Sequence, residues 1–115
     1  MAVDRLKSRI WVQAQIRMCD LAHLPVYVVS RGDPDAGVII LRLNRLDGTC
    51  HLFTQARTAA GERAWTKASG ADAEGRLEDA AADAYIARQR KFDPDLWVIE
   101  IEDPERRYLL DADIV

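Results

Sequence analysis

The chain opens with an amphipathic pattern that predicts a helix from Val3 to about Leu24. On a helical wheel of about 100° per residue, one apolar stripe predicts the face that packs on the core. Its members are Val3, Leu6, Ile10, Ala14 and Leu21. A second apolar group lies on the opposite side of the wheel and consists of Val12, Ile16 and Cys19. Because an exposed apolar stripe is unusual on a monomer, this second face predicts a homodimer contact.

Alternating apolar and polar positions after this helix predict an antiparallel sheet. Strands are expected at residues 26–29, 38–45, 49–57 and 63–67, with a turn-rich loop at 31–37. The pair Asp47-Gly48 favours a two-residue hairpin turn. That turn would place Asn44 opposite His51 and Leu43 opposite Leu52. Cys50 and Leu52 would then share one apolar face with Leu43.

A second helical stripe follows the polar loop at residues 68–76. Its apolar members are Leu77, Ala81, Ala84, Tyr85 and Phe92. Arg88 falls inside this stripe, where a guanidinium needs a carboxylate or a bound anion. Residues 93–95 end the helix, and a last hairpin is expected from residues 96–102 and 107–110.

These elements predict one globular α+β domain over residues 1–115. We expect a mostly antiparallel sheet of about five to six strands packed with two helices, in the order α-β-β-β-β-α-β-β. The chain is 49% hydrophobic and 30% charged, which supports a packed core and excludes a disordered chain.

The absence of a signal peptide and of a membrane-spanning run from the sequence predicts the cellular location. The N-terminus has no apolar run of a signal peptide, and the longest aliphatic run, residues 38–41, is too short to cross a membrane. We therefore expect a cytoplasmic protein in which the two cysteines, Cys19 and Cys50, are free thiols.

Charge is divided unevenly along the chain. Residues 1–67 carry 10 basic and 6 acidic side chains, whereas residues 68–115 carry 6 and 13. This division supplies no uniform basic field of the kind that duplex nucleic acid needs. We expect neither nucleic acid nor a membrane as a partner.

Four clusters of residues carry a resemblance to a known family. They are Gly32-Asp33-Pro34 with Ala36-Gly37; Gly61-x-Arg63-x-Trp65; Arg88-Gln89; and Asp93-Pro94-Asp95-x-Trp97-x-x-Glu100-x-Glu102-Asp103. Together, over nearly the whole chain, they resemble an uncharacterised bacterial family of short single-domain proteins found mainly in alphaproteobacteria. The resemblance implies a bacterial protein, and it implies no activity, cofactor or catalytic residue.

The residue types that bind metals do not combine into a complete set. Cys19 and His23 are four positions apart on the first predicted helix, which suits a zinc site. Adjacent strand residues point to opposite faces, so only one of Cys50 and His51 could join them. Because three ligands at best result, and no third group orients a Cys/His nucleophile, we expect no metal, no cofactor and no catalytic residue.

The acidic segment at residues 93–103 is the best candidate for chemistry. Glu100 and Glu102 project from the same face of a predicted strand. Together with Asp95 they resemble a metal-dependent nuclease pattern, except that Glu102 stands where that pattern has a lysine. The alternative is a solvated strand face paired with neighbouring arginines.

The candidate binding residues are Arg63, Trp65, Arg88, Asp95 and Glu100. Arg63 and Trp65 project from the same side of their strand, and Trp65 beside residues 31–33 could line a concave site. For Arg88, a structural ion pair with Asp95 or Glu100 and an anion-binding site both stay open.

Two functional interpretations follow. The sequence favours a small binding or interaction module without catalytic activity, since every catalytic pattern is incomplete. The alternative is a small enzyme or anion-binding protein with its site between Arg88 and residues 93–102, for which metal-assisted phosphodiester chemistry is the leading reaction.

Overall fold

The computed structural model describes residues 6–115 and contains two helices and a six-stranded mixed sheet. In chain order the elements are α1 (Ser8–Leu21), β1 (Val26–Ser30), β2 (Ile39–Asn44), β3 (Thr49–Arg57), β4 (Arg63–Lys67), β5 (Arg76–Glu78), α2 (Asp79–Phe92) and β6 (Trp97–Glu102). The predicted α+β class is confirmed. The order differs in two places, because β5 precedes α2 and residues 107–110 form no strand. Val3, the predicted start of the first helix, lies outside the described residues.

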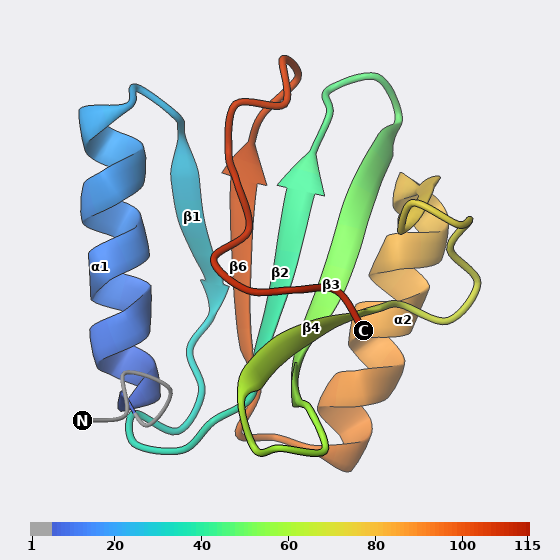
Figure 1. The fold of residues 1–115 in the computed structure, drawn as a ribbon. Coiled ribbons are helices and arrows are strands. Elements are labelled where there is room, and N and C mark those ends of the chain that lie inside the picture. Colours follow the sequence, from blue (N-terminus) through green and yellow to red (C-terminus); the bar gives the residue numbers. More distant parts are fainter. Residues whose placement is uncertain (1–5) are drawn as a thin grey trace.

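The last strand of the chain lies inside the sheet. The strand order is β1-β6-β2-β3-β4, with β5 paired to β3. β6 runs antiparallel to β1 and parallel to β2, and the remaining pairs are antiparallel. Figure 1 shows β1 at one edge of the sheet beside α1, and α2 at the far side of the molecule.

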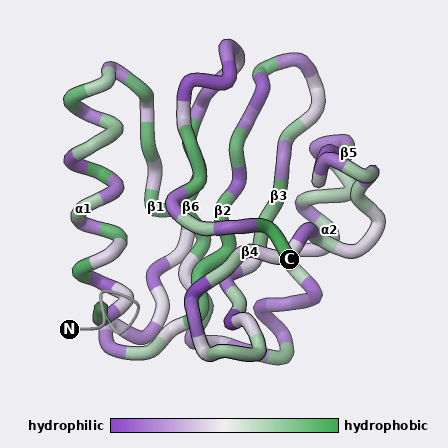
Figure 2. Tube along the Cα trace, viewed as in Figure 1, coloured by the Kyte–Doolittle hydropathy of each residue, from purple (hydrophilic) through white to green (hydrophobic). Residues whose placement is uncertain are grey.

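The sheet separates two apolar layers. The layer under α1 contains Trp11, Val12, Cys19, Leu24, Ile39, Leu41, Leu43, Phe53, Trp65, Trp97, Ile99 and Ile101. The layer under α2 contains Ile40, Cys50, Leu52, Ala68, Leu77, Ala82, Tyr85, Leu96 and Val98. Neighbouring residues of β2 and β6 therefore enter opposite layers, which explains the three consecutive apolar residues that open each strand, 39–41 and 97–99. Figure 2 shows hydrophobic segments on these central strands, interrupted by hydrophilic positions.

α1 packs on the sheet with the face that the sequence assigns to a dimer. Val12 and Cys19 are only 2% and 1% exposed, and Ile16 packs against the same core. Leu21, from the predicted core stripe, is 72% exposed. The prediction of a homodimer contact through Val12, Ile16 and Cys19 is therefore wrong, because the fold itself buries Val12 and Cys19 and packs part of Ile16 on the core. The side of the helix that carries the large Trp11 side chain is the side that is buried.

The hairpin between β2 and β3 has a longer turn than predicted. Asn44 pairs with Cys50 and Leu43 pairs with His51. Leu46 adopts a positive φ of 58°, and its N–H donates to the Asn44 side chain at 2.8 Å. The longer turn shifts β3 by one residue, which exchanges its two faces. Cys50 consequently faces α2 and not the layer that contains Leu43.

Two further expectations are tested by the described residues. Cys19 and Cys50 are buried free thiols, as predicted. Within residues 6–115, neither helix has the length and apolar composition needed to span a bilayer.

Candidate functional site

Arg63 and Trp65 lie together, and both bind the C-terminal segment. The carboxylate of Asp111 accepts hydrogen bonds from the indole Nε1 of Trp65 at 3.0 Å and from that of Trp11 at 2.8 Å. It also pairs with Nη2 of Arg63 at 3.1 Å. Since Trp65 has no exposed surface, it lines no open site. The loop that was expected beside Trp65 instead contacts Trp97, whose Nε1 donates to the carbonyl of Asp33 at 2.7 Å.

The C-terminal segment also closes one edge of the sheet. The N–H of Trp65 donates to the carbonyl of Asp113, and the N–H of Val115 donates to the carbonyl of Trp65, both at 2.8 Å. Ile114 forms a parallel bridge with Trp65. In Figure 1 this segment crosses the sheet and ends at β4. The chain therefore pairs the outer edge of β4 with its own last residues.

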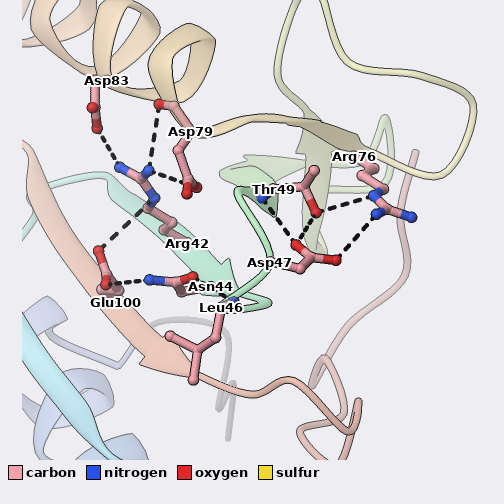
Figure 3. Close-up of polar contacts among 9 residues, drawn as sticks. All are labelled: Arg42, Asn44, Leu46, Asp47, Thr49, Arg76, Asp79, Asp83 and Glu100. Atoms are coloured by element: carbon pink, nitrogen blue, oxygen red, sulfur yellow. Dashed lines mark hydrogen bonds and ion pairs between the residues drawn. The ribbon is translucent and has the colours of Figure 1, made fainter.

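Glu100 belongs to an ion network around the buried Arg42, which the sequence analysis did not single out (Figure 3). The Arg42 side chain is 10% exposed and binds Asp83 at 2.6 Å and Asp79 at 3.0 Å. Glu100 lies 3.8 Å from Nε of Arg42 and accepts a hydrogen bond from Asn44 at 3.1 Å.

The electrostatics of this network indicate a structural role. Burial lowers the pKa of Arg42, but the hydrogen bonds to Asp83 and Asp79 outweigh burial and raise that pKa above its ordinary value. The charge of Arg42 is thus balanced by carboxylates from α2 and β6. These contacts join the buried guanidinium of β2 to two carboxylates of α2, and so help to hold the helix on the sheet.

Arg88 and Asp95 lie apart from both clusters. Arg88 is exposed on α2, and its guanidinium lies over the ring of Tyr85, 6.0 Å from the centroid. No carboxylate of residues 6–115 forms an ion pair with Arg88. The prediction that Arg88 is buried against Asp95 or Glu100 is wrong, because α2 packs through Ala82 and Tyr85.

The acidic segment is not assembled into a metal site. In the described part of the chain, no three His, Cys, Asp or Glu side chains are grouped so that they could hold a metal ion. Asp95 is exposed, and its carbonyl accepts the N–H of Asp33 at 3.0 Å. Asp95 therefore holds the loop at residues 32–37 through its backbone.

The opposite edge of the sheet is open. β1 is the terminal strand and pairs only with β6. The N–H of Glu102 donates to the carbonyl of Pro25 at 2.9 Å. Because bonding alternates along an antiparallel pair, the backbone groups of Val26 and Val28 point away from β6. No backbone hydrogen bond from another segment of residues 6–115 reaches these groups.

The side chains of this open edge are apolar. Tyr27 and Val29 are 49% and 55% exposed, and Val28 is also exposed. Edge strands are usually protected by charged side chains or a proline, and β1 contains neither in its five residues. A bulge between Val28 and Ser30 ends the regular edge.

A groove runs between this edge and α1. It encloses about 350 Å³ and is lined by Arg9, Val12, Gln13, Ile16, Val28, Arg31 and Trp97. The guanidinium of Arg31 lies over the Trp97 ring, 5.7 Å from its centroid. Among the described residues, no carboxylate forms an ion pair with Arg9 or Arg31. The groove therefore joins an apolar wall, an open strand edge and two unpaired cations.

The sequence analysis identified this surface only in fragments. Residues 26–29 were predicted as a strand, but nothing in their pattern showed that β6 would cover one side only. Arg9 and Arg31 are separated by a helix and a strand, so their proximity depends on the tertiary fold. The available signal was the run Val26-Tyr27-Val28-Val29, which lacks the charges expected on an exposed edge.

Comparisons with known proteins identify one family. The model of a family described as protein of unknown function (DUF1491) matches residues 6–111. A crystal structure at 1.87 Å of a DUF1491 family protein from Caulobacter crescentus CB15 is 34% identical, with a TM-score of 0.81 over 96% of this chain and 99% of that one. An NMR structure of a DUF1491 family protein from the same organism has 34% identity and a TM-score of 0.80, over 96% of this chain and 97% of that chain.

A second organism gives a similar result. The solution structure of protein Atu0922 from A. tumefaciens is 32% identical, with a TM-score of 0.73 over 94% of each chain. No curated protein matches the chain. The resemblance to an uncharacterised, mainly alphaproteobacterial family is thus confirmed, and the chain belongs to the DUF1491 family of proteins of unknown function.

Proposed function

We propose that this protein is a cytoplasmic, single-domain interaction module without catalytic activity, which binds an extended segment of a partner as an additional strand along β1. The contrast between the two sheet edges carries the proposal. The chain pairs β4 at Trp65 with its own C-terminal residues and leaves the backbone of β1 unpaired on its outer side.

Strand addition uses the backbone groups that β1 presents. The outward N–H and C=O groups of Val26 and Val28 can form the ladder with an incoming strand, which supplies affinity independent of sequence. Alternate side chains of that strand would point toward α1, where Val28 and Ile16 line the groove. Pairing would also cover the exposed apolar edge.

The experiment is a selection of binders from a display library of short random peptides on the wild-type protein. Selected peptides are then measured by fluorescence anisotropy on Val28→Pro and on the matched control Val28→Thr. Proline removes the outward N–H, and it is tolerated on an edge strand where that N–H would face solvent. Threonine keeps the N–H and the β-branched shape. Circular dichroism and thermal melting verify that both variants are folded.

We expect wild type and Val28→Thr to bind alike, and Val28→Pro to bind about tenfold more weakly. Hydrogen exchange of the Val26 and Val28 amides should slow when peptide is added, since both become ladder donors. A library that yields no binder, or binders equally tight on folded Val28→Pro, would contradict strand addition at β1.

A further inference from the structure

We propose that the segment bound at β1 carries a carboxylate, which Arg9 and Arg31 bind at one end of the groove. This inference rests on the proposed strand addition and specifies the chemistry of the partner. The carboxylate belongs either to an aspartate or glutamate side chain or to the C-terminus of the partner, since both present the same two oxygens to arginine.

The two arginines lie at the same end of the groove because α1 and β1 run in opposite directions. Arg9 is in the first turn of α1, and Arg31 directly follows the end of β1. Figure 1 shows α1 starting at the lower end of the molecule and β1 running downward, toward that end. Both side chains line the same cavity. The groove is thus cationic at one end and apolar along its walls.

The nearby acids Asp33 and Asp35 form other contacts and no ion pair with Arg9 or Arg31. The carboxylate of Asp33 accepts the backbone N–H groups of Asp35 and Ala36 at 3.1 and 2.8 Å, and Asp35 lies 3.7 Å from Lys7. Arg31 is held over Trp97, which orients its guanidinium and leaves its N–H groups free to bind a ligand.

The apolar wall defines the rest of the partner. Val12, Ile16 and Val28 surround the space into which alternate side chains of the added strand would point. Aliphatic or aromatic side chains fit such a wall, whereas a basic side chain would approach two arginines. The partner segment is therefore an extended peptide with apolar residues and one carboxylate near the end that lies beside Arg31.

A second copy of this chain is not the occupant that the contacts favour. Its C-terminal residues 111–115 are acidic and apolar, but they already pair with β4. Asp111 is held by Trp11, Trp65 and Arg63. If the wild type formed dimers without any peptide and Val28→Pro did not, the edge of β1 would bind a second copy of the chain. That result would contradict this inference.

The test measures the selected peptides on Arg9→Gln and Arg31→Gln. Arg88→Gln is the matched control, because Arg88 is also an exposed arginine stacked on an aromatic ring, but it lies on α2. In parallel, each peptide is made with its acidic residue changed to the amide, and with its C-terminus amidated. The peptide change that weakens binding to the wild type shows whether the carboxylate belongs to a side chain or to the C-terminus.

We expect selected peptides to be acidic or to require a free C-terminus, and binding to weaken about tenfold in Arg31→Gln and less in Arg9→Gln. Removing the peptide carboxylate should weaken binding less in Arg31→Gln than in the wild type, as in a double-mutant cycle, because only Arg9 then remains to bind it. Peptides that are sensitive to Val28→Pro but not to either arginine variant would overturn the carboxylate proposal alone. Peptides insensitive to Val28→Pro would overturn strand addition itself.

Discussion

The carboxylate of Asp111 accepts a hydrogen bond at 2.8 Å from the indole of Trp11, 100 residues earlier in the chain. The same carboxylate binds Trp65 and Arg63. This one side chain therefore joins the C-terminal segment to α1 and to β4.

Substitution of Asp111 by alanine should loosen the C-terminal segment. It would leave two indole N–H groups and Arg63 without their acceptor, which we expect to lower the free energy of unfolding by about 1–3 kcal/mol. Urea denaturation measures the loss, and hydrogen exchange of the Val115 amide should become faster. Asp113→Ala is the control, because Asp113 binds Trp65 through its carbonyl. Equal stability of the two variants would contradict the anchoring role.

Arg42 and Arg88 provide a matched pair for the ion network. Arg42→Met would remove the partner of Asp79, Asp83 and the half-buried Glu100. We expect a loss of about 1–3 kcal/mol of stability, because the charged hydrogen bonds to Asp79 and Asp83 are lost and Glu100 loses its counter-charge. Arg88→Met should change stability by no more than about 0.5 kcal/mol, since Arg88 is exposed. A comparable loss in both variants would contradict the structural assignment of Arg42.

His51 should make stability dependent on pH. Burial, followed by the charges of Arg45 and Arg106, lowers the pKa of His51, and its neutral Nδ1 accepts the Nε–H of Arg45 at 3.0 Å. As the pH falls, His51 therefore binds a proton at a higher pH in the unfolded chain than in the folded protein. Its contribution to the free energy of unfolding is fully present above about pH 6.5 and decreases as the pH drops below that value.

The histidine contribution can be isolated by mutation. His51→Gln should lose part of the pH dependence below about pH 6.5, whereas His23→Asn, at an exposed position, should retain it. Urea denaturation at several pH values measures both variants. If His51→Gln keeps the full slope, the loss of stability arises from other groups.

The two thiols should react slowly in the native protein. Cys19 and Cys50 are buried, and burial raises the pKa of Cys50 to about 11. Because the thiolate is the reactive form, both groups should resist a disulfide reagent at neutral pH and react quickly after denaturation. Titration of denatured, unreduced protein should find two thiols. Fast reaction of the native protein would show that one of the two layers opens readily.

The sequence predicts elements well where a local pattern determines them. α1, α2 and the strands from β1 to β4 and β6 follow from apolar periodicity and turn residues. The register of the β2–β3 hairpin was missed because Leu46 adopts a positive φ, which lengthens the turn around Asp47-Gly48. A prediction from turn residues assigns a positive φ to glycine and not to leucine.

The orientation of the helices was missed for a different reason. The first helix offers two apolar groups, and the choice depends on which group meets the sheet. In α2 the predicted core face included Phe92, which is exposed, and therefore also contained Arg88. In the structure Ala82 and Tyr85 are the buried residues of α2. The candidate site depends on Arg9, Arg31 and the open edge of β1, which only the strand order brings together.

The central position of β6 has a consequence for synthesis of the chain. β1 and β2 are both early strands, and each pairs with β6 on one side. While residues 97–102 are still within the ribosome, β1 has no strand to pair with and the layer that α1 covers is incomplete. The protein must therefore hold its first strand exposed until nearly the whole chain has emerged, and a chaperone or a partner that recognises this strand would meet it before the sheet closes on its inner side.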